Sequence, residues 1–244
     1  MEYPIWQLTT LAGGFWIALI ATVHVFVAQF AVGGGLFLVL TEHYAYRKRS
    51  DAILDYVKKH TLFFLLLTMV FGALTGVGIW FSIALISPRS TIELIHLFVF
   101  GWATEWVFFI VEIVALIIYY YKFNTMSRRD HLAVGWVYFA AAWLSLFVIG
   151  GIIAFMLTPG AWLENGSFWS AFFNPTFWPS LVFRTFLSFA LAGLYGFLTA
   201  SRIEDAETRE RMVRYCAVWA LVPVVLMLAS GWWYLHALPD AQYT

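Results

Sequence analysis

Residues 21–35, ATVHVFVAQFAVGGG, decide the fold class, because nearly every side chain in this stretch is apolar. The stretch lies within a longer run, residues 10–41, that contains no Lys, Arg, Asp or Glu. A bilayer core of about 30 Å is crossed by about 20 helical residues. The run therefore predicts a membrane-spanning helix that holds His24 at membrane depth.

Five further apolar runs of spanning length follow, at residues 61–86, 93–121, 132–158, 178–201 and 212–236. The chain of 244 residues is 62% hydrophobic and 11% charged, which leaves too little polar surface for a soluble domain. Backbone groups inside a bilayer must bond within their own segment, and the runs lack the alternation of barrel strands. We predict an all-α polytopic membrane protein with one domain over residues 1–244, in which helices one to four form a bundle and helices five and six are added. The first helix is expected to be retained, because its apolar run is too long for a cleaved signal.

Basic residues are distributed asymmetrically along the chain. Twelve of the 14 Lys and Arg residues fall in three predicted loops, 42–60, 122–131 and 202–214, whereas the opposite loops carry only Arg89. The positive-inside rule places these loops in the cytoplasm and both termini outside the inner membrane of a prokaryotic cell. The sequence has no basic nucleic-acid patch, and its single cysteine, Cys216, excludes a Cys-based metal cluster. The expected surroundings are therefore lipid, with no nucleic-acid partner.

Ionisable residues inside a membrane are costly, so His24 is a candidate functional residue. On a helix it shares one face with Ala28, Ala31 and Gly35, which are four, seven and eleven residues further on. Small residues beside an imidazole leave a flat space that suits a porphyrin, and neutral imidazole is a common ligand of haem iron. The alternative is close helix packing, with His24 hydrogen-bonded to a neighbouring helix.

Glu105 and Glu112 are seven residues apart and therefore lie on one face of the third helix. The low dielectric of a membrane penalises two ionised carboxylates at such a spacing, so the pair could pass protons or ligate iron; otherwise each is a neutral packing residue. Arg184 lies near the outer end of the fifth helix, where it could snorkel to the interface or clamp a haem propionate.

The remaining polar positions carry weaker signals. His96 and His236 are candidate second ligands for an iron at His24, although each also fits an interface position. His60 is expected at the cytoplasmic interface, and His43 and His131 are expected to be solvated in basic loops. Gly72 and Gly76 form a GxxxG pattern that predicts close helix packing.

These residues, taken in order, resemble the N-terminal part of subunit I of the cytochrome bd quinol oxidase family. The likeness rests on HVFVAQFAVGGGLFLVLTE from His24 to Glu42, FGALTGVGIWF at 71–81, TEWVFFIVEI at 104–113, SLFVIGGIIAFMLTP at 145–159 and FNPTFWPSLVFRT at 173–185. It covers most of residues 10–200. The family has a haem-ligating histidine followed by a glutamate at the interval of His24 and Glu42.

The resemblance implies that His24 is an axial ligand of a haem b in the bundle of helices one to four. It implies that Glu105 and Glu112 are a haem-side carboxylate and a proton-path group, with Glu105 as a candidate metal ligand; their spacing differs by one from the family's, so the two roles stay unassigned. The number of haems and the presence of a haem of the d type are left open. Expected partners are quinone or quinol, a second membrane subunit and a c-type cytochrome.

The chain also departs from the family pattern. Trp80 stands where the second helix of the family has a glutamate, and Arg184 stands at the position of a haem-ligating histidine. The later helices, the quinol-binding loop and a methionine ligand have no counterpart in the 244 residues, so this chain is expected to be incomplete as an oxidoreductase on its own. The predicted function is a b-type cytochrome subunit that moves electrons between quinol and a redox partner or oxygen. The alternative is a haem-free scaffold subunit; a transporter is disfavoured because paired inverted repeats are not seen.

Overall fold

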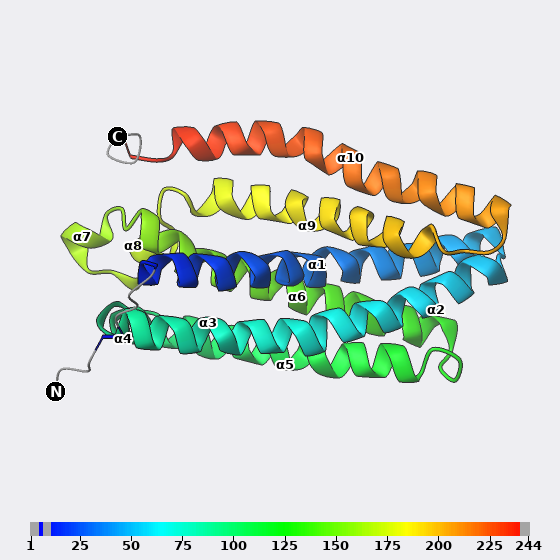
Figure 1. The fold of residues 1–244 in the computed structure, drawn as a ribbon, viewed down its shortest axis with the longest axis horizontal. Helices are drawn as coiled ribbons and strands as arrows, with labels where there is room; N and C mark the ends of the chain where they lie inside the picture. The colour runs from blue at the N-terminus through cyan, green and yellow to red at the C-terminus, as the bar shows by residue number, and fades with distance from the viewer. Residues whose placement is uncertain (1–4, 7–10, 240–244) are drawn as a thin grey trace.

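The computed structural model describes residues 5–6 and 11–239, and all regular secondary structure in them is helical. Six helical segments are long and apolar enough to cross a membrane: Gly13–Lys48 (α1), Asp51–Ile86, Val99–Tyr121 (α5), Arg128–Leu157 (α6), Phe177–Ala200 (α9) and Ala206–His236 (α10). They lie roughly side by side, and the start of α1 and the end of α10 are at the same end of the bundle (Figure 1). The predicted all-α, six-span fold is confirmed. Residue 10, the predicted start of the first helix, lies outside the described residues.

Four of the six spans, α1, the second span, α6 and α10, extend beyond the predicted apolar runs at the end that carries the basic residues. The predicted loop 42–60 is helical except for a short turn, in which Arg49 adopts a left-handed conformation with φ 52°. The next residue, Ser50, accepts a hydrogen bond from the Ile53 backbone N–H and begins α2 (Asp51–Leu65). Ser127 and Asp205 likewise cap α6 and α10. Hydropathy marks only the part of a helix inside the bilayer, whereas caps and charges extend it into water.

The second span consists of three consecutive segments: α2, a π-helical segment η1 (Leu66–Gly72) and α3 (Ala73–Ile86). A short helix, α4 (Pro88–Leu97), begins with a proline in its first turn, where the missing N–H is not needed. Two short helices, α7 (Trp162–Asn165) and α8 (Phe168–Phe172), occupy the aromatic outer loop. This loop is thus folded onto the end of the bundle, with Phe172 buried.

α1 is the central helix of the bundle and packs against α3, α6 and α9, while α5 packs on α6 and α10 packs on α9. The approach of α1 to α9 requires glycine, because a Cβ on Gly33 would lie 1.9 Å from the carbonyl oxygen of Ser188. Such small-residue contacts are typical of membrane helices, where backbones approach closely. The fifth span is therefore joined to the first four through α1.

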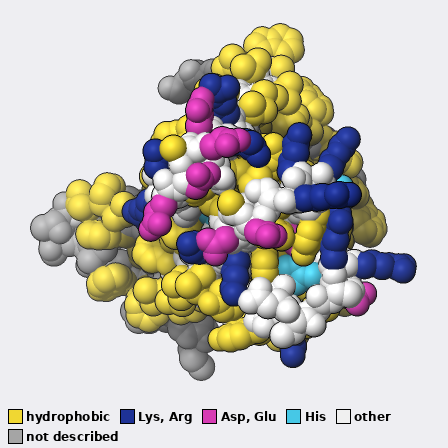
Figure 2. Space-filling view, turned by 90° about the vertical axis from the view of Figure 1, so that its right-hand side faces the viewer, with side chains coloured by type: hydrophobic (Ala, Val, Ile, Leu, Met, Phe, Trp, Pro, Cys, Tyr) yellow, Lys and Arg dark blue, Asp and Glu magenta, His cyan; other side chains and the backbone are white. Residues whose placement is uncertain are grey.

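Figure 2 shows the end of the bundle opposite the chain termini, where Lys, Arg, Asp and Glu side chains gather over the turns between the spans. Residues 42–60, 122–131 and 202–214, which meet at this end as turns and helix ends, contain twelve of the 14 basic residues. The rest of the bundle exposes large apolar side chains, for example Leu221 and Leu228 of α10 and Phe100 of α5. This division into a charged end and an apolar belt is the arrangement expected of a multi-pass membrane protein.

Candidate functional site

His24 of α1 is held by a hydrogen bond to α3, because its Nδ1 lies 3.0 Å from the Thr75 hydroxyl oxygen. The Thr75 hydroxyl in turn lies 2.9 Å from the Phe71 carbonyl and 3.1 Å from the Gly72 carbonyl, to which it donates. Thr75 therefore accepts the proton of His24 Nδ1, which leaves the lone pair on Nε2. Besides Thr75, the Gly72 backbone lies within hydrogen-bonding reach of the His24 ring, and no other partner of the ring occurs in the described part of the chain. With Nδ1 engaged, Nε2 is the ring nitrogen that can act as a ligand.

Glycines of η1 and α3 allow this approach of α1. A Cβ on Gly76 would lie 3.2 Å from His24 Cε1, and one on Gly72 would lie 3.3 Å from Val27 Cγ1. The close packing predicted from the GxxxG pattern is confirmed. The hydrogen bond across to a neighbouring helix, which was the alternative interpretation of His24, is also present, and it leaves Nε2 unused.

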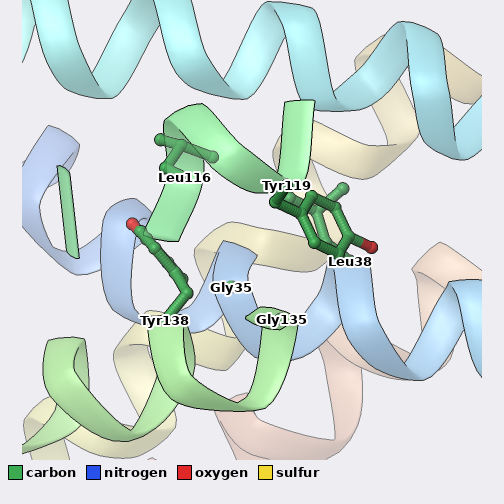
Figure 3. A pocket seen from close by; sticks show the side chains of 6 residues that line it. All are labelled: Gly35, Leu38, Leu116, Tyr119, Gly135 and Tyr138. Carbon is green, nitrogen blue, oxygen red and sulfur yellow. The ribbon is translucent and has the colours of Figure 1, made fainter. Parts of the chain in front are cut away.

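The small residues that follow His24 differ in what covers them. Ala28 and Ala31 are half-buried, but Gly35 packs against the Tyr138 ring, and a Cβ there would lie 2.4 Å from Tyr138 Cε1. The Tyr138 hydroxyl donates to the Ala31 carbonyl over 3.1 Å. Figure 3 shows Gly35 and Tyr138 at a cavity of about 10 Å³, which is the size of about one water molecule. Tyr138 therefore excludes a flat ligand from the end of the stripe at Gly35.

The two glutamates of α5 face α6 together. The Ser145 hydroxyl donates to Glu105 Oε1 over 2.9 Å, and Glu112 also lies within hydrogen-bonding reach of Ser145. Glu112 further lies close enough to Tyr138 to interact with it electrostatically. The shared face predicted from the spacing is confirmed, and Ser145 is the group that connects the two carboxyls.

Arg184 lies on a different side of α1 from His24. It belongs to α9, where its Nε donates to the Ser180 hydroxyl over 3.1 Å. α9 packs on the Gly33 side of α1, and nine residues separate Gly33 from His24, which is about half a turn around a helix. The structure therefore does not bring Arg184 and His24 together.

Neither candidate second histidine is held toward the interior. His96 and His236 are exposed, and the Nδ1 of each bonds the carbonyl four residues earlier, at 2.8 and 2.9 Å. No group of three or more His, Cys, Asp or Glu residues that could hold a metal ion occurs in the described chain. A single imidazole donor suits a metal that brings its own macrocycle, so the donor chemistry at His24 fits haem.

His131 was predicted to be solvated, and this prediction is wrong. It lies in the first turn of α6 and is 1% exposed. Its Nδ1 is 2.8 Å from Glu42 Oε1, its Nε2 is 2.8 Å from the Tyr119 carbonyl, and the Tyr119 hydroxyl donates to Glu42 Oε2 over 2.5 Å. α1 and α6 continue past their apolar runs, and together with α5 they bury this triad. An acidic residue directly after an apolar run was the one signal for it.

His60 was predicted at the cytoplasmic interface; it lies at the charged end of the bundle, but its side chain is fully buried between helices. α2 begins at Asp51 rather than at residue 61, so His60 lies well inside the helix and faces α9. Its Nδ1 is 2.8 Å from the Thr199 hydroxyl, while its Nε2 is buried without a hydrogen-bond partner among the residues that the structure describes.

Comparison with known proteins adds two findings. The sequence profile of a family described as "Cytochrome bd terminal oxidase subunit I" matches residues 15–243. Among solved structures, a chain of the bd oxidase from Geobacillus thermodenitrificans is similar to this one, with a TM-score of 0.76 at 20% sequence identity. The similar region covers 90% of this chain and 53% of the solved chain, so this chain spans about half of that length. A search of curated proteins found no match.

Proposed function

Because the chain belongs to the cytochrome bd terminal oxidase subunit I family, an oxidoreductase family, we propose that it is a membrane b-type cytochrome subunit. In this proposal His24 ligates the iron of a haem b, and the subunit moves electrons between quinol and a redox partner or oxygen. The chain acts together with a second membrane subunit or a c-type cytochrome.

The observation that carries the proposal is the hydrogen bond between His24 and Thr75. Metal-ligating histidines commonly donate their second ring N–H to an oxygen, which fixes the tautomer and the ring orientation. Thr75 does this for Nδ1 and leaves Nε2 as the ligand atom. Ala28 and Ala31, on the same helix face, are small and half-buried, as a site for a flat group beside the ring requires.

A bound haem supplies one-electron redox chemistry, and the remaining polar groups handle protons. Glu105, Ser145 and Glu112 form a connected set on α5 and α6. A hydroxyl that can donate to one carboxyl and accept from another can pass a proton between them. We assign Glu105 and Glu112 to proton transfer, with Glu105 also a candidate iron ligand. Arg184, on the α9 side of α1, would serve only a propionate that lies between α1 and α9.

In this proposal the charged end of the bundle faces the cytoplasm across a prokaryotic inner membrane, as the positive-inside rule supports, and both termini are outside. In this orientation His24 belongs to the outer half of α1, because it lies 23 residues before Arg47 at the basic end of that helix. A redox partner outside the membrane would approach from that half.

An absorption spectrum of the purified chain tests the proposal. We expect a reduced-minus-oxidised difference band of a b-type haem, with a pyridine haemochrome that names the porphyrin and so decides between haem b and haem of the d type. The rival function is a haem-free scaffold, which the family's oxidoreductase partners would complete. A folded protein without any such band, purified with its partner subunits, would establish the rival and contradict the proposal.

A further inference from the structure

Glu42, Tyr119 and His131 form a buried polar group that the proposed function does not use. Glu42 follows His24 on α1 by 18 residues, about 27 Å along a helix, so the group is far from the proposed haem ligand. Each member comes from a different span, α1, α5 or α6, and the side chains of Glu42 and His131 are 0% and 1% exposed. A buried group of this composition can hold a proton, and its hydrogen bonds determine how many protons it needs.

Both ring nitrogens of His131 face an acceptor. Nε2 lies 2.8 Å from the Tyr119 backbone carbonyl, and because a carbonyl oxygen can only accept, Nε2 carries a proton. Nδ1 lies 2.8 Å from Glu42 Oε1, and an ionised carboxylate also only accepts. A neutral imidazole has a single N–H. The two contacts together therefore require one proton more than a neutral histidine and an ionised glutamate possess.

The surroundings of the pair favour this proton on the ring. Glu42 accepts the Tyr119 hydroxyl on Oε2 over 2.5 Å and lies within hydrogen-bonding reach of Tyr46, and such donors favour the ionised form of a carboxylate. Tyr119 is two residues before the end of α5, so its carbonyl is one of the last four of that helix, which attract a cation. The pair is therefore an imidazolium and a carboxylate.

Tyr46 connects the buried group with the surface. It is half-buried, and its ring lies 4.3 Å from the exposed guanidinium of Arg128, at the start of α6. The titratable and charged side chains that surround His131 among the described contacts thus come from all three spans: Glu42 and Tyr46 from α1, Tyr119 from α5 and Arg128 from α6. Through Tyr46, Glu42 has a hydrogen-bonded connection along which the group can exchange a proton with water.

We propose that Glu42 and His131 form a proton-binding site that holds the charged ends of α1, α5 and α6 together in a pH-dependent way. With the proton in place, every hydrogen bond of the group is made. When the proton is released to water at alkaline pH, His131 keeps one N–H for two acceptors, so either the Glu42 contact or the Tyr119 carbonyl contact is lost. A buried acceptor pair without a proton between them is unfavourable, so the contact between the spans weakens.

Equilibrium unfolding of the full chain in detergent, between about pH 7 and about pH 9, tests this proposal. In an unfolded chain a histidine releases its proton near about pH 6.5, whereas the folded pair retains it. Folding then takes up one proton, so the unfolding equilibrium constant of the wild type should rise roughly tenfold per pH unit relative to that of Glu42→Gln. The amide introduced by Glu42→Gln donates to a neutral His131 and accepts from Tyr119, so this variant needs no extra proton.

Glu204→Gln removes an exposed carboxylate at the same end of the bundle and should keep the pH dependence of the wild type. An equal pH dependence in the wild type and in Glu42→Gln would overturn the proposal. Nitrogen NMR of the wild-type chain, isotopically labelled at its six histidines, gives a second readout that depends on no variant. At about pH 8, where free imidazole is neutral, one histidine should keep the signals of an imidazolium. A spectrum of neutral rings alone would overturn the proposal as well.

Discussion

Glu42 of α1 and His131 of α6 lie 2.8 Å apart and are both withdrawn from solvent, with exposed side-chain fractions of 0% and 1%. Tyr119 of α5 completes the group by donating its hydroxyl to the second carboxylate oxygen. Three spans are thus joined by polar contacts at the charged end of the bundle. Removing one partner from such a group costs stability, because the remaining polar partner stays buried without a counterpart.

We therefore expect His131→Phe to destabilise the bundle by about 3–5 kcal/mol, since Glu42 would lose its imidazole partner in a buried site. The unfolding midpoint in detergent should fall markedly. The double variant Glu42→Leu with His131→Phe should recover part of the loss, because it removes both polar partners together. His43→Phe, at an exposed neighbouring position of α1, is the control. Unchanged midpoints in the single variant would show that the pair contributes nothing.

The contact of α1 with α9 gives a prediction about packing. Gly33→Ala would place a Cβ 1.9 Å from the Ser188 carbonyl oxygen, so the two helices would have to separate. We expect the free energy of unfolding to fall by about 1–3 kcal/mol, the usual cost of overpacking, and the unfolding midpoint to fall with it. Gly14→Ala is the matched control, because a Cβ there meets no atom within 4 Å. Equal midpoints for the two variants would contradict the described approach of the helices.

Thr75 is expected to act on the proposed haem site through His24. In Thr75→Val the shape is kept but the acceptor for His24 Nδ1 is lost, so the ring is no longer held in one tautomer. Changes of this kind commonly weaken a metal site by about 10–100-fold. We expect lower haem occupancy or a shifted midpoint potential by redox titration, with Thr75→Ser close to wild type. Thr104→Val, on exposed α5 surface, should have no effect on either quantity.

The start of α10 gives a prediction about pH. Hydrogen bonds from the Thr208 hydroxyl and from its backbone N–H hold the pKa of Asp205 below its ordinary value. Because the folded pKa is the lower one, the cap is complete above the unfolded pKa of about 3.9 and is lost as the pH falls through the folded value. The hydrogen-exchange protection factor of the Thr208 amide should therefore be constant near neutral pH and should fall below about pH 4. In Asp205→Asn, which keeps an acceptor but does not titrate there, the acid-induced fall should disappear.

The number of spans and the shared face of Glu105 and Glu112 could be predicted from the sequence, because both depend on spacing within one helix. The contacts of His60 and His131 could not. Each follows a basic or polar stretch that reads as solvent-exposed, yet the helices continue there and pack against α9 and α5. A partner such as Thr199, 139 residues away along the chain, leaves no trace in the local pattern.

The extent of the candidate site likewise could not be predicted from the local sequence pattern. His24 and Gly35 do lie on one face of α1, but the Tyr138 ring of another span covers the end of this face at Gly35. Arg184 lies in the first half of α9, which packs on the opposite side of α1 from His24, because tertiary packing sets the order of the spans around α1. Small residues such as Gly33 fix that order, and their contacts appear only in the folded chain.

Ligation of iron by His24 is the central claim, and chemical rescue tests it most directly. In His24→Gly, purified with its partner subunits, we expect the difference band of the b-type haem to be lost or strongly shifted, and added imidazole to restore it by occupying the vacated position. His96→Gly should keep the band without imidazole. A band that is unchanged in His24→Gly, at full haem content, would show that another residue holds the iron.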